Sequence, residues 1–126
     1  LLGICLGQQL LFESSEEGDA EGLALLPGRV TRLPASKEAP APHMGWSKLK
    51  IEQDNPLLEG VEDGAYAYFV HSYVCPIDSN TVASAQYGQT FAAIVNRGNA
   101  YGCQFHPERS SAVGARILAN FLSLSC

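Results

Sequence analysis

The sequence predicts an α/β protein in which a short strand turns sharply into a helix near the start of the chain. Residues 1–12, LLGICLGQQLLF, place a cysteine between two glycines, after an apolar run and before a helix-like segment that begins at residue 8. Residues 66–75, YAYFVHSYVC, are aromatic and β-branched, as in a strand. Residues 113–121 repeat apolar side chains at helical spacing. Strands and helices in one short chain indicate the α/β class.

The composition indicates one domain. With 126 residues, of which 46% are hydrophobic, the chain can bury a single core, so we expect one domain, or part of one, over 1–126. A net charge of −5 without a basic cluster argues against a nucleic-acid partner. The apolar runs are shorter than the roughly 20 residues that a membrane span needs, and no basic segment precedes the first of them. We therefore expect a cytoplasmic protein that does not enter a membrane.

The cysteines indicate a reducing compartment. The four of them, Cys5, Cys75, Cys103 and Cys126, form no CxxC pair and show no metal-like spacing with the three histidines. We interpret them as free thiols and expect neither a metal nor a cofactor.

The chain begins on what reads as the last residues of a strand, without an initial methionine. A strand of a parallel sheet needs neighbours on both sides to cover it. Nothing upstream supplies them, so we expect the C-terminal part of a domain whose N-terminal strands are missing.

The Gly-Cys-Gly turn over 3–7 is the layout of a nucleophile elbow. Glycines two positions on either side of Cys5 let neighbouring backbone pass without a Cβ clash, and the tight turn pushes the cysteine side chain toward substrate. The N-terminus of the following helix favours thiolate over thiol, and the N–H of Leu6 is placed to donate to an oxyanion. The alternative is a cysteine that acts as a small buried hydrophobe.

Local patterns predict the elements that follow. In chain order they are an acidic solvated loop over 13–21, a strand over 28–33, an irregular proline-rich connection over 34–42, a loop over 43–46, a short strand over 49–51, a polar turn region over 55–64, a strand over 66–75, a hairpin over 81–87 and 91–96 that turns near Gly88 and Gln89, a strand over 100–105, and a helix from Ser110 or Ser111. The loop over 43–46 has two interpretations. Either Trp46 caps the core, or Met44 and Trp46 contact a partner, since both residue types are enriched at interface cores.

The segment GCQFHPERS, residues 102–110, supplies a second set of reactive groups. Alternate side chains of an extended chain share a face, so His106 and Glu108 can point the same way, and Pro107 stiffens the backbone between them. The Glu108 carboxylate would then hold Nδ1–H of His106, which leaves Nε2 free to take the proton of Cys5. This is the order nucleophile, base and orienting group. A histidine at a strand end is otherwise commonly a surface residue.

GICLGQQ together with QFHPE resembles the class I (triad) glutamine amidotransferases. PHMGW, YFVHSY and QFHPERS resemble, within that family, the glutaminase subunits of imidazole glycerol phosphate synthases. The resemblance implies a flavodoxin-like fold, an open mixed sheet flanked by helices. It implies hydrolysis of L-glutamine to glutamate and ammonia, in which Cys5 forms a glutamyl thioester, His106 moves the proton and Glu108 orients His106.

The same resemblance implies further site residues. Gln9, Glu17, His71, Ser72 and Tyr73 match positions that bind glutamine, the last three largely through backbone. A (β/α)₈ barrel cyclase subunit of histidine biosynthesis would receive the ammonia, and Met44, Trp46 and Arg109 would face it. Arg109 stands where lysine is common in the family, and Gln8 where methionine is common. The second oxyanion donor of the family lies on an upstream loop that this sequence lacks.

Other interpretations remain open. The elbow and the HPE segment are shared with the glutaminases of anthranilate, GMP and carbamoyl phosphate synthesis. A cysteine peptidase or γ-glutamyl hydrolase of similar fold would need no synthase. A non-catalytic module that binds a partner is the third alternative, against which the presence of Cys5, His106 and Glu108 argues.

Overall fold

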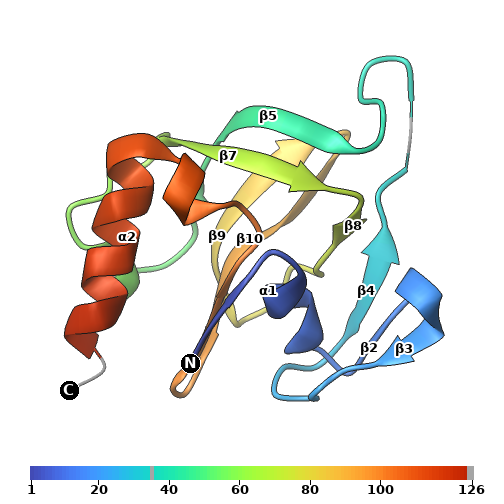
Figure 1. Cartoon of the computed structure of the whole chain (residues 1–126), viewed down its shortest axis with the longest axis horizontal. Helices are drawn as coiled ribbons and strands as arrows, with labels where there is room; N and C mark the ends of the chain where they lie inside the picture. The colour runs from blue at the N-terminus through green and yellow to red at the C-terminus, as the bar shows by residue number, and fades with distance from the viewer. Residues whose placement is uncertain (35, 125–126) are drawn as a thin grey trace.

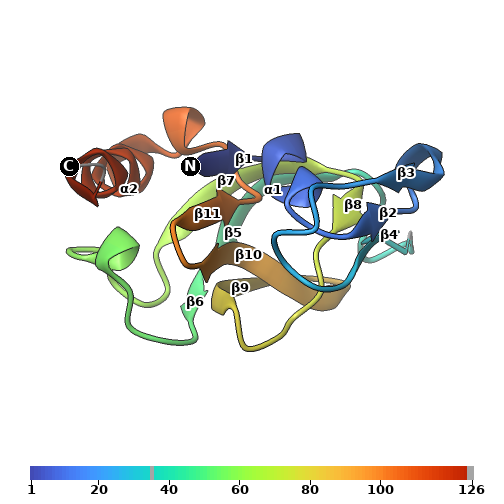
Figure 2. The same ribbon diagram turned by 90° about the horizontal axis from the view of Figure 1, so that it is seen from below.

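A computed structural model describes residues 1–34 and 36–124 of the chain. Its main element is a five-stranded mixed sheet in the order β1-β11-β10-β9-β6, seen from below in Figure 2. The strands are β1 (Leu2–Ile4), β11 (Ala100–Cys103), β10 (Gln89–Arg97), β9 (Thr81–Tyr87) and β6 (Lys50–Ile51). β1 runs parallel to β11, whereas the other neighbours are antiparallel. The predicted open mixed sheet is therefore confirmed.

The predicted hairpin over 81–96 is the centre of this sheet. β9 and β10 pair with Tyr87 opposite Gln89, and the turn falls on Gly88, whose φ of +73° favours glycine. Phe91 to Val95 of β10 are all buried, because packed clusters cover both faces of this strand. Ala92 and Val95 pack in one cluster with Leu11 and Phe12, whereas Phe91 and Ile94 belong to the larger cluster.

A two-stranded antiparallel ribbon crosses one end of the molecule in Figure 1. It consists of β5 (His43–Lys48) and β7 (Tyr66–His71), in a register that sets His43 opposite His71 and Lys48 opposite Tyr66. The loop expected over 43–46 is therefore wrong. In β5 the buried side chain is His43, and the large apolar residues Met44 and Trp46 point outward, so the alternation is the reverse of that in an ordinary half-buried strand.

A small four-stranded sheet lies beside the first helix, in the order β3-β2-β4-β8. Its strands are β2 (Ser14–Ser15), β3 (Ala20–Glu21), β4 (Arg29–Arg32) and β8 (Tyr73–Val74), with a 3₁₀ turn, η1 (Glu17–Asp19), between β2 and β3. The acidic segment predicted as a loop is thus partly strand, because its backbone pairs with the predicted strand over 28–33. The single strand expected over 66–75 divides at Ser72, since β7 and β8 pair in different sheets.

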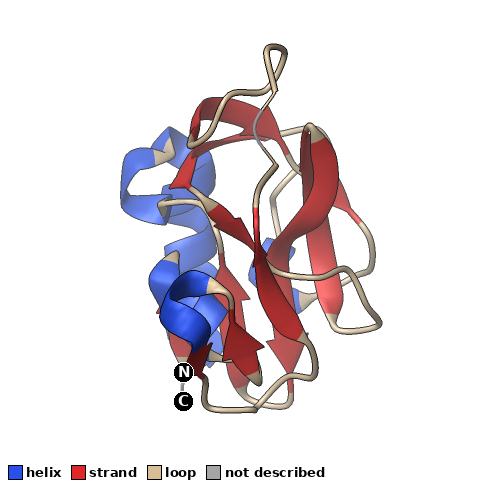
Figure 3. Ribbon diagram, turned by 90° about the vertical axis from the view of Figure 1, so that its right-hand side faces the viewer, coloured by secondary structure: helices blue, strands red, loops and turns tan. Residues whose placement is uncertain are grey.

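The helices are few, and strands make up most of the regular structure (Figure 3). They are α1 (Leu6–Leu10), α2 (Ser111–Leu124) and the 3₁₀ turns η2 (Pro56–Leu58) and η3 (Pro107–Arg109). The predicted C-terminal helix is confirmed as α2, which buries Ile117, while Asn120 Nδ2 donates to the carbonyl oxygens of Leu57 at 2.9 Å and Glu59 at 2.8 Å. Among the described residues, no helix has the length and apolar character to cross a membrane.

Helix α1 rests directly on the backbone of β11. Gly102 faces α1, and a Cβ atom at this position would lie 2.8 Å from Cγ of Gln8 and 3.1 Å from Cδ1 of Leu11. The absence of a side chain at Gly102 therefore sets how closely the helix approaches the sheet.

Candidate active site

Cys5 occupies the turn between β1 and α1, as the elbow pattern predicts. Its φ of 55° and ψ of −108° are strained for a residue with a side chain. The turn is held by the Cys5 N–H, which donates to the carbonyl of Cys103 at 2.8 Å and so continues the pairing of β1 with β11. Helix α1 begins at Leu6, two residues earlier than the sequence indicated.

The two glycines of the elbow have different roles. A Cβ atom on Gly3 would collide with the carbonyl of Gly7, because α1 folds back over the end of β1. A Cβ atom on Gly7 would meet nothing within 4 Å. The prediction that backbone passes close to both glycines is therefore confirmed for Gly3 and wrong for Gly7. The backbone that passes close to Gly3 is the carbonyl of Gly7.

The thiol of Cys5 has three polar neighbours, the carbonyl of Val70, the amide of Gln104 and the N–H of Leu6. Sγ donates to the carbonyl of Val70 at 3.6 Å and accepts from Nε2 of Gln104 at 3.6 Å. Burial raises the pKa of this thiol above its ordinary value, the N–H of Leu6 and the amide of Gln104 act to lower the pKa, and the charges of Glu108 and Glu17 raise it further. The resting form is thus the thiol, and a base is needed to generate the nucleophile.

His106 follows β11, and β11 lies next to β1 in the sheet, so both reactive groups lie at the same end of the sheet. Nδ1 of His106 lies 3.1 Å from Oε2 of Glu108, as predicted. The backbone between them is a 3₁₀ turn rather than the extended segment expected, because the Ser110 N–H bonds the Pro107 carbonyl. Glu108 can only accept, so Nδ1 carries the hydrogen and the lone pair of Nε2 is free for a proton.

A pocket of about 190 Å³ opens beside the thiol. It is lined by Cys5, Leu6, Gln9, Glu17, His71, Ser72 and Tyr73. The residues predicted to bind substrate therefore come together around Cys5, although they belong to α1, η1, the end of β7, the start of β8 and the residue between these two strands. Gln9 uses both amide hydrogens within the protein, on the carbonyl of Tyr73 at 3.2 Å and on Oε1 of Gln104 at 3.0 Å. Its Oε1 therefore remains to accept from a ligand.

The residues predicted to meet a partner lie on the outer face of the β5–β7 ribbon. Met44 is 63% exposed and Trp46 is 50% exposed, so Trp46 does not cap the core. The Trp46 ring contacts Tyr68 edge to face at 5.7 Å between centroids, and Arg109 lies over the Tyr68 ring at 4.5 Å. We call Met44, Trp46, Tyr68 and Arg109 the aromatic face.

Gln8 occupies an apolar site under the elbow. It is fully buried, and its Nε2 donates to Sγ of Cys75 at 3.3 Å and to the carbonyl of Ala92 at 3.3 Å. Its Oε1 is buried without a hydrogen-bond partner. Cys5, Cys75 and Cys103 are free thiols, as expected, and Cys126 lies outside the described residues.

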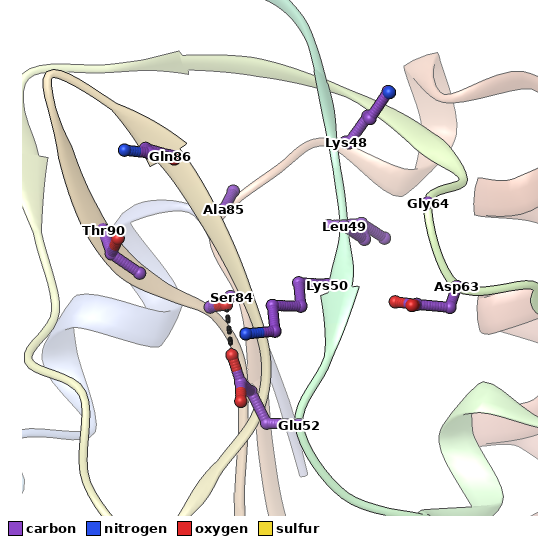
Figure 4. A pocket seen from close by; sticks show the side chains of 10 residues that line it. All are labelled: Lys48, Leu49, Lys50, Glu52, Asp63, Gly64, Ser84, Ala85, Gln86 and Thr90. Carbon is purple, nitrogen blue, oxygen red and sulfur yellow. Dashed lines mark hydrogen bonds between the residues drawn. The ribbon is translucent and has the colours of Figure 1, made fainter.

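A second pocket, of about 340 Å³, lies between β6 and β9 (Figure 4). Lys48, Lys50, Glu52 and Asp63 line it, and Ser84 Oγ donates to Oε2 of Glu52 at 2.6 Å. It contains neither a thiol nor an imidazole, so the chemistry of the elbow is not available there. Within 1–34 and 36–124, the acidic, cysteine and histidine side chains form no group suited to hold a metal ion.

Sequence reasoning missed the buried polar residues behind the pocket, Gln104 and His43. Gln104 lies inside the QFHPE segment, and both residues are almost fully buried. A polar residue in an apolar stretch was the available signal, since such groups are buried only with partners.

Residues 1–124 match the model of the class-I glutamine amidotransferase family, and the chain belongs to this family. It is 56% identical over 124 residues to the imidazole glycerol phosphate synthase subunit HisH of Xylella fastidiosa strain 9a5c, a match that covers 98% of this chain and 62% of the relative. It is 53% identical to the subunit HisH of Xanthomonas axonopodis pv. citri, over 99% of this chain and 62% of the relative. The chain therefore spans less than two thirds of the length of these relatives.

The fold is similar to that of solved structures. A putative GMP synthase protein of Thermoplasma acidophilum superimposes with a TM-score of 0.66 at 21% identity, over 98% of this chain and 55% of the other. At this identity the likeness concerns the fold alone.

Proposed function

We propose that the protein is the glutaminase subunit of an imidazole glycerol phosphate synthase in histidine biosynthesis. It hydrolyses L-glutamine to glutamate and ammonia and delivers the ammonia to a (β/α)₈ barrel cyclase, with which it forms a cytoplasmic heterodimer. The identity of 52–56% to HisH subunits supports this assignment over the other synthases. The pocket that joins Cys5 to Gln9, Glu17 and the strip from His71 to Tyr73 is the observation that carries the proposal.

The proposed reaction follows from which groups of the site donate protons and which accept them. Cys5 Sγ attacks the carboxamide carbon of glutamine while Nε2 of His106 takes the thiol proton. The Leu6 N–H donates to the oxygen that becomes negative. His106 then gives its proton to the leaving nitrogen, which departs as ammonia. Afterwards Nε2 of His106 takes a proton from the water that attacks the thioester and returns it to the Cys5 sulfur after the carbon–sulfur bond breaks. Glu108 keeps the Nδ1–H tautomer of His106 throughout.

Substrate recognition is proposed for the remaining lining residues. The carboxylate of Glu17 pairs with the α-ammonium group of glutamine, and Oε1 of Gln9 accepts from the substrate because the Gln9 amide hydrogens are already used. The backbone of His71, Ser72 and Tyr73 forms the opposite wall.

The aromatic face is the proposed contact with the cyclase. Aromatic residues and arginine dominate the energy of protein interfaces, and here Trp46 and Arg109 both pack on Tyr68. Arg109 belongs to η3, the turn that also carries Glu108. A partner on this face would thus touch the turn that orients the base.

Glutamate release from L-glutamine tests the proposal. The full-length protein is assayed with and without the cyclase, the latter supplied with its phosphoribosyl-aminoimidazole nucleotide, beside a Cys5→Ala variant. We expect slow release alone, faster release with the liganded partner, and none with Cys5→Ala. Equally fast release without the partner would instead favour a stand-alone hydrolase, and activity in Cys5→Ala would remove the elbow from the mechanism.

A further inference from the structure

A line of hydrogen bonds made by side-chain amides ends on the sulfur of Cys5. It runs from the carbonyl of Tyr73 through Gln9 and Gln104 to Sγ, with distances of 3.2, 3.0 and 3.6 Å between the successive polar atoms. Gln9 is 6% exposed and Gln104 is fully buried. Gln104 does not line the substrate pocket.

The direction of this line is fixed by the carbonyl at its start. A carbonyl oxygen only accepts, so the Gln9 atom facing Tyr73 is the amide nitrogen. The same nitrogen faces Gln104, so the Gln104 atom there is the oxygen. The Gln104 nitrogen is consequently the atom that faces Cys5. Turning either amide over would set two acceptors or two donors against each other in a buried site, which is costly.

The carbonyl oxygen of Tyr73 accepts a second hydrogen bond, which comes from a pair of buried histidines. Nδ1 of His71 donates to it at 2.9 Å, and Nε2 of His71 accepts from Nδ1 of His43 at 3.0 Å. Nε2 of His43 in turn accepts from Oγ of Ser47 at 2.9 Å. Burial lowers the pKa of both imidazoles, so both rings are neutral. In neutral rings, the Nδ1–H that His71 donates to Tyr73 leaves Nε2 of His71 to accept from His43, and Nε2 of His43 to accept from Ser47.

The resting thiol and the thiolate use these neighbours differently. The thiol hydrogen lies toward the Val70 carbonyl. When that proton leaves, the Val70 oxygen faces a negatively charged sulfur with no hydrogen between them, which is unfavourable. The Gln104 N–H is oriented to donate in both states, and its bond strengthens when the acceptor becomes charged.

We propose that Gln104 is a catalytic residue, whose amide N–H donates to Sγ of Cys5 and stabilises the thiolate that attacks the substrate and that leaves when the thioester is cleaved. Gln9 and the carbonyl of Tyr73 position this amide. The catalytic part of the inference rests on the proposed glutaminase function, whereas the contact with the thiolate does not.

The structure offers a matched control. Gln8 is also a fully buried glutamine whose Nε2 lies beside a cysteine sulfur, but that sulfur belongs to Cys75 and is not the nucleophile. Gln104→Met and Gln8→Met therefore remove the same amide by the same substitution. Gln104→Glu is a second test variant, because it keeps the shape and the acceptor for Gln9 while setting an oxygen without a hydrogen against Sγ.

The first measurement is the rate of iodoacetamide alkylation at Cys5 against pH, followed by peptide mass mapping in the full-length protein. It requires no glutamine, and burial keeps Cys75 and Cys103 unreactive by raising their pKa values. We expect both Gln104 variants to alkylate roughly tenfold more slowly below the midpoint, with the midpoint about one pH unit higher. Gln8→Met should keep the midpoint of the parent protein. An unchanged midpoint in the Gln104 variants, or an equal shift in Gln8→Met, would overturn the inference.

The second measurement is glutaminase kinetics with the liganded cyclase. We expect kcat to fall roughly tenfold in Gln104→Met with KM nearly unchanged, because Gln104 does not touch the substrate pocket. A fall in kcat/KM that comes from KM alone contradicts a role on the thiolate. A shifted alkylation midpoint in a protein without any glutaminase activity would instead mean that the proposed function fails while the contact between Gln104 and the thiolate stands.

Discussion

His43 and His71 face each other in the core, and both rings are neutral. His43 is 2% exposed and stacks between Phe69, at 4.9 Å, and Tyr87, at 4.1 Å between ring centroids. A proton on His43 would place a charge in a buried site among aromatic rings. Burial therefore favours the neutral form of both rings.

Acidification should remove stability through His43. Burial first, and the neighbouring His71 second, lower the pKa of His43 from its ordinary 6.5 to about 4. Since the folded pKa lies below the unfolded one, this contribution is fully present above about pH 6.5 and is lost as the pH falls toward 4. We expect it to lower the free energy of unfolding in urea by about 2 to 3 kcal/mol between pH 7.5 and pH 4.5.

The control is His43→Gln, which has no titrating group at this position. Carboxyl groups titrate equally in both proteins, so the difference between the two pH profiles isolates the histidine. Parallel profiles would contradict the prediction.

The turn between β1 and α1 contains two glycines. The structure requires the absence of a side chain at Gly3 but not at Gly7. We expect Gly3→Ala to destabilise the protein by about 2 kcal/mol or more, because its Cβ would collide with the Gly7 carbonyl. Gly7→Ala should be neutral or stabilise by up to about 1 kcal/mol, since space is open and alanine favours a helix.

Urea unfolding of both variants measures the difference, and alkylation of Cys5 reports on the turn itself. Equal effects of the two substitutions would show that the collision at Gly3 is relieved by movement of α1.

The elements that could be predicted are those whose signals are local. The hairpin of β9 and β10 has an uninterrupted β pattern around a glycine turn, and α2 has an apolar stripe. β5 could not be predicted because its large apolar residues Met44 and Trp46 point outward, and this pattern, directly after a proline-rich segment, is typical of a loop. The break at Ser72 arises because β8 pairs with β4, a long-range choice that no local pattern carries.

The whole molecule shows the same contrast at the site, between residues that have a local sequence signal and residues that depend on long-range contacts. Cys5, His106 and Glu108 stand in motifs whose spacing indicates their chemistry, so the sequence is sufficient to propose them as site residues. Gln104 and His43 contact residues far away in the chain, such as Cys5 and His71. These contacts depend on which atoms the fold brings together, and the spacing of residues does not reveal them.

The aromatic face should determine affinity for the cyclase. We expect Trp46→Ala to weaken the complex by about 2 kcal/mol, roughly 30-fold in Kd, because a large aromatic side chain would lose its contacts with the partner. The free energy of unfolding should change little, since Trp46 is 50% exposed. Isothermal titration of the full-length protein with the cyclase measures the affinity.

Leu23→Ala is the matched control, since Leu23 is 63% exposed and lies after β3, away from the β5–β7 ribbon. An equal loss of affinity in this variant, or none in Trp46→Ala, would place the interface elsewhere.

Gly102 has a consequence for the geometry of the nucleophile. Cys5 is tied to β11 by its backbone, whereas Gln8 of α1 and Leu11, which follows α1, lie against Gly102. A side chain at position 102 would push α1 away from the sheet. The Leu6 N–H would then move, while the hydrogen bond to β11 would hold the turn at Cys5 in place. The proposed alignment of the Leu6 N–H with the Cys5 sulfur would thus depend on the small size of Gly102.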